Sequence, residues 1–192
     1  MSRPTRHWLI CLLLLLVFQA TPGNAQSRLR GLPLIRNFHT VEYKAGIQNW
    51  DIARDKRGII YIANNFGLLE YDGSQWKLYS VKNGTKARSV AIDHRGRIFV
   101  GCQGDFGYFF PDRSGNLTFT SLADSLPSQY RNFDETWSVY IDHETVYFCT
   151  FRNIFIYDGT ALTVAEPDEP LELSFLVNGE LIVTSLASGM KR

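Results

Sequence analysis

The chain has 192 residues, and its 20 Lys and Arg residues nearly balance its 19 Asp and Glu residues, so that the formal net charge is +1 at pH 7. This balance excludes the strongly basic surface of a typical nucleic-acid-binding protein and the acidic composition of a disordered tail. Hydrophobic residues make up 45% of the sequence, which is typical of a globular protein with a buried core.

Residues 1–25 have the pattern of a cleaved secretory signal peptide. Arg3 and Arg6 precede an unbroken apolar run at 8–18, and small residues follow at 23–25, where a signal peptidase would cut. The apolar run is too short for a membrane span, which needs about 20 helical residues. We therefore predict a periplasmic or secreted protein with no membrane span after the signal; an uncleaved membrane anchor is the alternative.

Residues 26–49 are interpreted as a lead-in to the fold. Apolar residues occur at 32–35 and at Phe38, Val41 and Tyr43. Such a segment can supply a strand that completes a sheet formed by the far end of the chain, because a closed ring of sheets avoids open edges. We therefore predict a lead-in strand within 26–49.

Residues 50–79 consist of four short apolar runs separated by turn sequences. The runs cover 50–53, 59–63, 68–71 and 75–79, and the turns between them are rich in Asp, Asn and Gly. These turn residues tolerate positive φ angles and local side-chain hydrogen bonds, as tight turns require. The pattern predicts a four-stranded antiparallel meander. Because one such sheet cannot bury its own face, stacked copies of it are expected.

The rest of the chain repeats this pattern. The turn at 55–58 recurs 38 residues later at 93–96, and the Tyr-Asp-Gly sequence of 71–73 recurs at 157–159. Repeats of about 40 residues with four strands each are typical of β-propeller blades. We therefore predict an all-β protein built of four-stranded antiparallel blades. The predicted repeats cover 50–80, 87–122, 137–165 and 173–192.

The last repeat and the longest connection qualify this prediction. The fourth repeat ends at Arg192, where its third strand should begin. We therefore expect a truncated propeller of about four blades, with a complete small propeller as the alternative. The insert at 111–135, between the second and third repeats, is rich in Ser, Asp, Asn and Pro and is predicted to lie on the surface.

Cys102 and Cys149 lie at similar levels of neighbouring repeats. In an oxidising compartment they could form a disulfide between two blades. The alternative is that each is a buried thiol that fills a small apolar space, as single cysteines on strands commonly do. The spacing leaves both alternatives open.

Alignment of the first strands of the repeats places Trp50, Arg88 and Trp137 at the same position. The first strand of each blade lines the central channel of a propeller, so these side chains are expected to face one another at its mouth. Two indoles and a guanidinium suit sugar rings and acidic groups, through stacking and paired hydrogen bonds. The alternative is that the three side chains only fill the space between blades.

Polar residues in the turns after the second strands form a second candidate set. They align among the first three repeats and predict a polar ring near the mouth. The residues of this set are Asn64, Asn65, Gln103, Asp105, Arg152 and Asn153. Trp76 and Tyr79 fall on the outermost strand and are interpreted as packing residues.

The sequence predicts no catalytic group, metal site or cofactor. His39, His94 and His143 are not spaced like ligands of one metal ion. The Asp-Phe-Gly sequence of 105–107 resembles a kinase motif in isolation, but it aligns with 65–67 and is interpreted as a blade turn.

The first repeat resembles the two-component regulator propeller repeat. The shared pattern is a hydrophobic strand, Asp-x-x-Gly, a second hydrophobic strand, Gly-Leu and then Tyr-Asp-Gly-x-x-Trp. It is carried by Ile52, Asp55, Gly58, Ile60, Gly67, Leu68, Tyr71, Asp72, Gly73 and Trp76. The third repeat departs from the pattern, since its turn at 142–145 lacks the Gly and 152–154 lacks Gly-Leu.

The resemblance implies the periplasmic sensor region of a hybrid two-component histidine kinase, or of a related regulator with a triple-tyrosine β-sandwich, of which this chain would be an N-terminal fragment. Members of that family are similar in sensing oligosaccharides released from glycans. The implied partners are an oligosaccharide and, in the intact receptor, a second copy in a homodimer. No nucleic-acid partner is expected for this segment.

Two other functions stay open. The first is a secreted propeller enzyme that acts on polysaccharide, and the second is an inert structural or interaction propeller. An enzyme would need an acid and a base that converge in the channel, whereas the aligned mouth positions carry Trp, Arg and Trp. This contrast favours a sensing segment that is not itself an enzyme.

Overall fold

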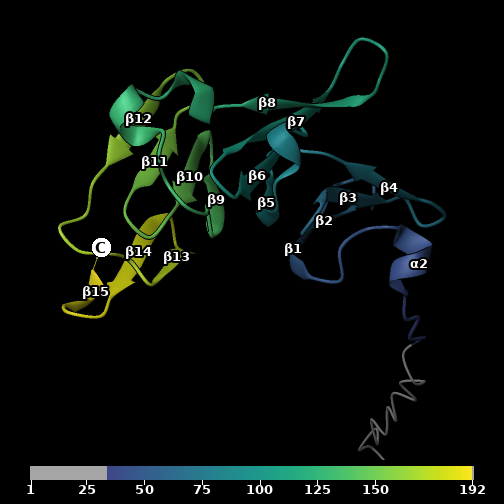
Figure 1. Cartoon of the computed structure of the whole chain (residues 1–192), viewed down its shortest axis with the longest axis horizontal. Helices are drawn as coiled ribbons and strands as arrows, with labels where there is room; N and C mark the ends of the chain where they lie inside the picture. Colours follow the sequence, from purple (N-terminus) through teal and green to yellow (C-terminus); the bar gives the residue numbers. More distant parts are fainter. Residues whose placement is uncertain (1–33, 192) are drawn as a thin grey trace, which may run out of the picture. The chain divides into compact units, whose positions relative to one another are not determined.

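The computed structural model describes residues 34–191 (Figure 1). The predicted signal peptide at 1–25 and the first part of the predicted lead-in, 26–33, lie outside this range. Residues 34–37 belong to an N-terminal unit and form no helix or strand, and Phe38–Arg192 forms a second unit that holds the sheets. No helix among residues 34–191 is long and apolar enough to cross a membrane.

The first sheet is a four-stranded meander in which consecutive strands pair antiparallel. Its strands are β1 (Asn49–Arg54), β2 (Ile60–Asn64), β3 (Gly67–Tyr71) and β4 (Trp76–Tyr79). In the β1–β2 turn, the Asp55 carboxylate accepts hydrogen bonds from the backbone N–H groups of Arg57 and Ile59. Gly58 completes this turn with a φ angle of +92°. The Asp-x-x-Gly motif therefore specifies the hairpin.

The second and third sheets repeat this order. The second sheet contains β5 (Ala87–Ile92), β6 (Ile98–Cys102), β7 (Phe106–Pro111) and β8 (Leu117–Ser121). The third contains β9 (Ser138–Asp142), β10 (Thr145–Cys149), β11 (Ile154–Tyr157) and β12 (Leu162–Ala165). In the β9–β10 turn, His143 adopts the left-handed conformation with a φ angle of +52°. Because His tolerates this region better than most residues, the third repeat keeps its hairpin without the turn Gly.

The fourth sheet has three strands among the described residues, and they pair in chain order. They are β13 (Leu173–Val177), β14 (Glu180–Ser185) and β15 (Gly189–Lys191). The short helices of the described chain are α2 (Thr40–Tyr43), η1 (Lys82–Gly84), η2 (Ala123–Ser125) and η3 (Ser128–Tyr130). The prediction of an all-β fold with about four antiparallel blades is therefore confirmed.

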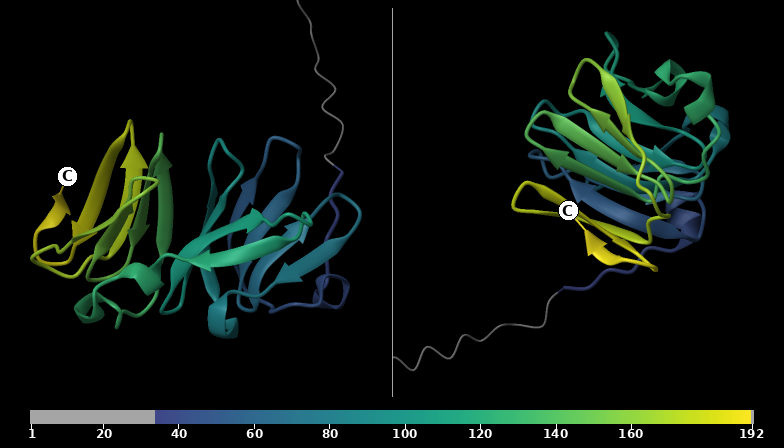
Figure 2. Two further views of the ribbon diagram at one scale, coloured as in Figure 1. Left: turned by 90° about the horizontal axis from the view of Figure 1, so that it is seen from above. Right: turned by 90° about the vertical axis from the view of Figure 1, so that its left-hand side faces the viewer.

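Neighbouring sheets lie side by side along the chain (Figure 2). Hydrophobic side chains fill the spaces between the first three sheets. Tyr61 of the first sheet and Val100 of the second are buried in one cluster. Between the second and third sheets, the Phe106 ring stacks on Phe155 at 4.8 Å and lies 4.4 Å from Phe148. Each blade thus buries the face of its neighbour, and each fully buried aromatic side chain contributes about 1.5–3 kcal/mol to stability.

A chain of hydrogen bonds also joins the inner strands of the first three sheets. Asp51 on β1 accepts hydrogen bonds from the Ser89 hydroxyl at 3.0 Å and from the Val90 N–H at 2.9 Å. The Ser89 hydroxyl oxygen in turn accepts a hydrogen bond from the Val139 N–H on β9 at 2.9 Å. From β9 to β13 the contact is of another kind, because the Tyr140 hydroxyl donates to the Ser174 carbonyl.

The lead-in differs from the prediction. Residues 34–48 contain helix α2 and no strand, and residue 49 already belongs to β1, so no separate lead-in strand is found in the described part of 26–49. Phe38 and Tyr43 pack against Trp76 on β4, with ring centres 5.1 and 5.6 Å apart. These aromatic contacts hold the segment against the outer strand of the first sheet, and Trp76 has the packing role expected of it.

The insert at 111–135 is only partly on the surface. It contains strand β8 and the helices η2 and η3. Ala123 and Leu126 are buried, and the Phe133 ring lies 5.0 Å from Phe155 on β11. The insert is mostly polar, so its few buried apolar residues were not predicted. These residues pack the insert against the second and third sheets.

Cys102 on β6 and Cys149 on β10 are both buried and form no disulfide. They belong to different hydrophobic clusters. Burial raises the pKa of the Cys149 thiol to about 11 and raises the pKa of Cys102 well above its usual range. The structure therefore corresponds to the alternative in which each thiol fills an apolar space.

We expect both thiols to resist alkylation at pH 8 in the folded chain, because the thiolate is the reactive form. Burial favours the neutral thiol of Cys149 and raises its pKa from the usual 9.0 to about 11. The contribution of this thiol to the free energy of unfolding is therefore fully present below pH 9.0 and is lost as the pH rises through about 11. Iodoacetamide labelling of the peptides that contain Cys102 and Cys149, with and without urea, tests this. Rapid labelling without urea would contradict the expectation.

Candidate ligand-binding site

Trp50, Arg88 and Trp137 lie together at the ends of the inner strands, and we call them the mouth cluster. The guanidinium carbon of Arg88 lies 3.9 Å from the centre of the Trp50 ring and 5.0 Å from that of Trp137. Trp50 is 43% exposed and Trp137 is 36% exposed, whereas Arg88 is buried. The guanidinium therefore lies between two indoles that remain open to solvent, which is a favourable cation–π arrangement.

Glu135 is the ion-pair partner of the mouth cluster and was not predicted. Its carboxylate accepts hydrogen bonds from Arg88 Nε at 2.6 Å and Nη2 at 2.7 Å. The remaining guanidinium nitrogen, Nη1, is buried and has no hydrogen-bond partner among the described residues. Because Glu135 belongs to the insert, which has no counterpart in the other repeats, alignment of the repeats could not find it.

Asn65 and Asn64 are neighbours with different roles. The Asn65 side-chain oxygen accepts a hydrogen bond from Trp50 Nε1 at 2.8 Å and so helps to orient the indole. Asn64 is fully buried, and its amide nitrogen donates to the Gly46 carbonyl at 2.7 Å. Asn65 therefore belongs to the mouth, whereas Asn64 fastens the lead-in to the first sheet.

Asp105 is enclosed between β6 and β7. Its carboxylate accepts hydrogen bonds from the Ser121 hydroxyl at 2.6 Å and from the Phe106 N–H at 2.8 Å. Burial raises the pKa of the Asp105 carboxyl, and these hydrogen bonds partly offset the effect. Gln103 pairs with Glu135 through an isolated β-bridge. These contacts give Asp105 and Gln103 structural roles in the turn.

Arg152 and Asn153 occupy the turn between β10 and β11. Arg152 is exposed, and both residues line a surface cavity that also contains Glu166 but not Trp137. The polar residues of the second predicted set are thus distributed among different contacts and do not form one ring. Equivalent turn positions diverge here because each turn packs against a different connecting segment.

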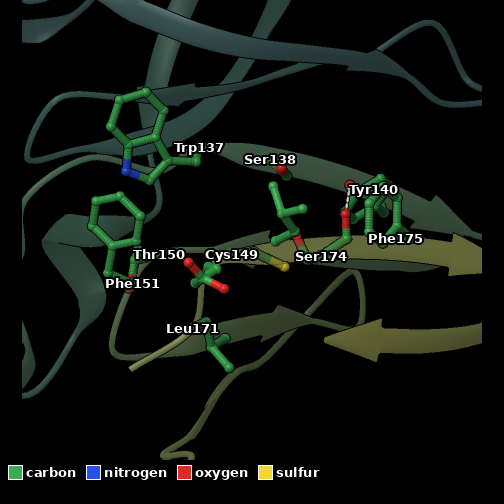
Figure 3. Close-up of a pocket in the computed structure, with 11 residues that line it drawn as sticks. Trp137, Ser138, Tyr140, Cys149, Thr150, Phe151, Leu171, Ser174 and Phe175 are labelled. Atoms are coloured by element: carbon green, nitrogen blue, oxygen red, sulfur yellow. Dashed lines mark hydrogen bonds between the residues drawn. The ribbon is translucent and has the colours of Figure 1, made fainter. Parts of the chain in front are cut away.

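A cavity of about 390 Å³ lies between β9 and β13, and we call it the seam cavity (Figure 3). Trp137 and Phe151 form one end of it, with ring centres 5.4 Å apart and both side chains exposed. Tyr140 and Ser174 lie toward the other end and are joined by their hydrogen bond. The volume lies within the range of small-ligand sites, which is roughly 300–1,000 Å³.

Glu172 also lines the seam cavity and holds the fourth mouth position. The Trp137 N–H donates to the Cys149 carbonyl, and the Glu172 N–H makes the corresponding bond to the Thr184 carbonyl. The exposed Glu172 side chain therefore holds the position in the fourth sheet that Trp137 holds in the third. Glu172 was not predicted because the fourth repeat was aligned from Leu173 onward.

Within residues 34–191, no group of three or more His, Cys, Asp or Glu side chains is arranged to hold a metal ion. His94 and His143 lie on exposed hairpin turns. His94 Nε2 is 3.3 Å from a carboxylate oxygen of Glu144, a surface contact between neighbouring turns.

Comparison with known proteins identifies the architecture. No protein-family model and no curated protein sequence matches the chain. Two similar solved structures are extracellular domains of proteins assigned as hybrid two-component systems of B. thetaiotaomicron, with TM-scores of 0.55 and 0.53, identities of 15% and 18%, and coverage of 74% and 71% of this chain. A virginiamycin B lyase from Staphylococcus aureus has a TM-score of 0.55 at 11% identity, over 75% of this chain and 50% of the lyase.

These similarities show that the chain has the fold of β-propeller blades. It covers 19% and 20% of the two extracellular domains, so it spans about a fifth of their length. The repeat resemblance pointed to the periplasmic sensor region of two-component systems, and extracellular domains of proteins assigned as such systems are among the structures that share the fold.

Proposed function

We propose that the chain is a ligand-sensing propeller segment located outside the cytoplasm, and that it binds an oligosaccharide at the mouth cluster and the seam cavity. The observation that supports this best is the exposed aromatic pair, Trp137 and Phe151, at the end of a cavity of about 390 Å³. Sugar rings place their apolar faces on aromatic side chains, and their hydroxyl groups bind polar groups at the edge of the site.

A role in signalling is supported by the fold that the chain shares with extracellular domains of two-component systems. In an intact receptor, the chain would form part of the periplasmic input region. Binding of the ligand would then shift the population of arrangements that two copies adopt in a homodimer. The differential affinity of the ligand for those arrangements would set the size of the signal.

The geometry favours sensing over cleavage of a polysaccharide. Glu135 is held by two hydrogen bonds from Arg88 and is not free to act as a base. Glu172 is the carboxylate that lines the seam cavity, and a single carboxylate is not the acid and base pair that glycoside hydrolysis requires. The lyase that shares the fold does not change this reading, because one fold supports many functions.

Replacement of Trp137 by Ala is expected to weaken oligosaccharide binding at least tenfold, because the indole supplies the stacking surface. The stability of the folded chain should fall by about 2 kcal/mol, since the side chain is two-thirds buried. Binding is measured by screening neutral, amino and acidic oligosaccharides on an array and then by calorimetry with the strongest hit.

Trp76→Ala is the matched control. It removes an indole that stacks on Tyr71 at 4.4 Å on the outer side of the first sheet. This variant should lose stability and keep its affinity. Equal losses of affinity in the two variants would mean that binding depends only on stability, and a native chain that binds nothing on the array would contradict the proposed function.

A further inference from the structure

Two of the four mouth positions carry a charged side chain, and the two charges are not equivalent. The inner strands place Trp50, Arg88, Trp137 and Glu172 at corresponding positions. The Arg88 charge is balanced by the paired Glu135 carboxylate, whose side chain is 13% exposed. No hydrogen bond or ion pair joins the Glu172 side chain to another residue within 34–191. Of these two charges, the uncompensated one is therefore negative.

Two other polar side chains of the seam cavity, Thr150 and Tyr140, are engaged within the protein. The Thr150 hydroxyl donates to the Asn153 carbonyl at 2.9 Å, and the Tyr140 hydroxyl donates to the Ser174 carbonyl. Glu172 is thus the charged group in the cavity that remains available to a ligand. A carboxylate accepts hydrogen bonds only, so it favours ligands that bring donors and repels ligands that bring another anion.

The aromatic end of the cavity favours the same kind of ligand. Trp137 and Phe151 present exposed ring surface, and aromatic faces attract cations. A primary ammonium group that pairs with Glu172 would lie in a cavity that also contains these rings. A uronate at this position would meet the Glu172 carboxylate, and Arg88 would not help it because that guanidinium is buried and already paired.

We infer that the seam cavity selects a sugar with a free amino group, which Glu172 binds as an ammonium while Trp137 and Phe151 contact the sugar ring. This inference rests on the proposed function and names the ligand class of the same site. It also changes the role expected of Arg88. The guanidinium positions the two indoles of the mouth cluster and does not itself bind an acidic group of the ligand.

Three disaccharides that differ in charge test the inference. They are chitobiose with free amino groups, neutral N,N′-diacetylchitobiose and anionic digalacturonate, titrated calorimetrically into the purified chain near neutral pH. We expect chitobiose to bind about tenfold more tightly than the neutral disaccharide, and digalacturonate to bind most weakly. The preference should shrink as salt is raised, because salt screens the partly exposed Glu172 charge.

Glu172→Gln should remove the preference for chitobiose and leave the affinity for the neutral disaccharide within about twofold. The control is Glu180→Gln, which makes the same charge change at the far end of the fourth sheet, where Glu180 pairs with Val177. That variant should keep the preference. A Glu172→Gln variant that still prefers chitobiose, or a native chain that prefers digalacturonate, would overturn the inference.

Failure of the inference and failure of the proposed function can be told apart. If none of the three disaccharides binds, or if the anionic one binds best, the assigned ligand class is wrong, and the oligosaccharide array still decides the proposed function. If the array also shows no binding, both are contradicted. Support for the inference requires the charge order and its loss in Glu172→Gln together.

Discussion

Replacement of Gly67 by Ala is expected to destabilise the folded chain by about 3 kcal/mol or more. Gly67 begins β3 with a φ angle of +126°, which side-chain-bearing residues rarely adopt. A Cβ atom at this position would lie 2.3 Å from the backbone carbonyl oxygen of Tyr79 on β4. Because both atoms belong to paired strands of one sheet, neither can move without disturbing the ladder.

Gly73→Ala is the control for the conformational part of this effect. Gly73 has a φ angle of +96°, and no atom lies within 4 Å of the Cβ that Ala would add. Its substitution should cost only about 1 kcal/mol. Thermal unfolding should show a decrease of roughly 6–12 °C for Gly67→Ala and of about 2–4 °C for the control. Similar decreases would show that the contact with β4 does not matter.

The glycines of the repeat made much of the fold predictable, and the close contact at Gly67 gives a physical reason for one of them. Gly107 makes a similar close approach in the second sheet, where its Cβ would lie 2.0 Å from the carbonyl oxygen of Thr120 on β8. The glycines of the repeat therefore mark places where the third strand meets the backbone of the fourth. The third sheet carries Asn153 at the position of Gly67, because Ile154 pairs with Cys149 as Leu68 pairs with Ala63.

The structure brings together the side chains whose expected placement depended on strand register. Trp50, Arg88 and Trp137 occupy equivalent positions on inner strands, and stacking of the blades is sufficient to bring them together. The turn residues were less predictable because a turn takes its contacts from whichever segment lies beside it. Asp105 turned inward to Ser121 for this reason.

Residues outside the repeat pattern could not be predicted. Glu135 reaches Arg88 from an insert that has no second copy, and Glu172 precedes the apolar residues by which the fourth repeat was aligned. Helix α2 was missed because its four residues are too few to show a helical period. Each of these features depends on a single tertiary contact or on one local segment.

The chain of hydrogen bonds that joins the inner strands of the first three sheets does not continue in the same form to the fourth sheet. The seam cavity lies at this point. Asp51 and Ser89 join the first three sheets through side chains that bind the backbone of the next strand. Between β9 and β13, Ser138 lines the cavity instead. The cavity therefore occupies the contact between blades that this chain of hydrogen bonds does not close, which leaves room for a ligand beside Trp137.

The second large effect is expected at the ion pair of the mouth cluster. Glu135→Ala should destabilise the fold by about 3–5 kcal/mol, because it leaves the Arg88 guanidinium buried without a counter-ion. The Arg88 side chain is only 7% exposed, and its Nη1 atom already lacks a partner among the described residues. The free energy of unfolding in urea measures this loss.

A double variant separates the cost of an unpaired charge from the value of the pair itself. Arg88→Met with Glu135→Leu replaces both charges by apolar side chains and should restore stability to within about 1 kcal/mol of the native chain, since buried ion pairs are often no better than apolar packing. Trp50 and Trp137 would then enclose a thioether in place of a guanidinium. If the double variant is as unstable as Glu135→Ala, the charged pair itself organises the two indoles, and the mouth cluster cannot be built by packing alone.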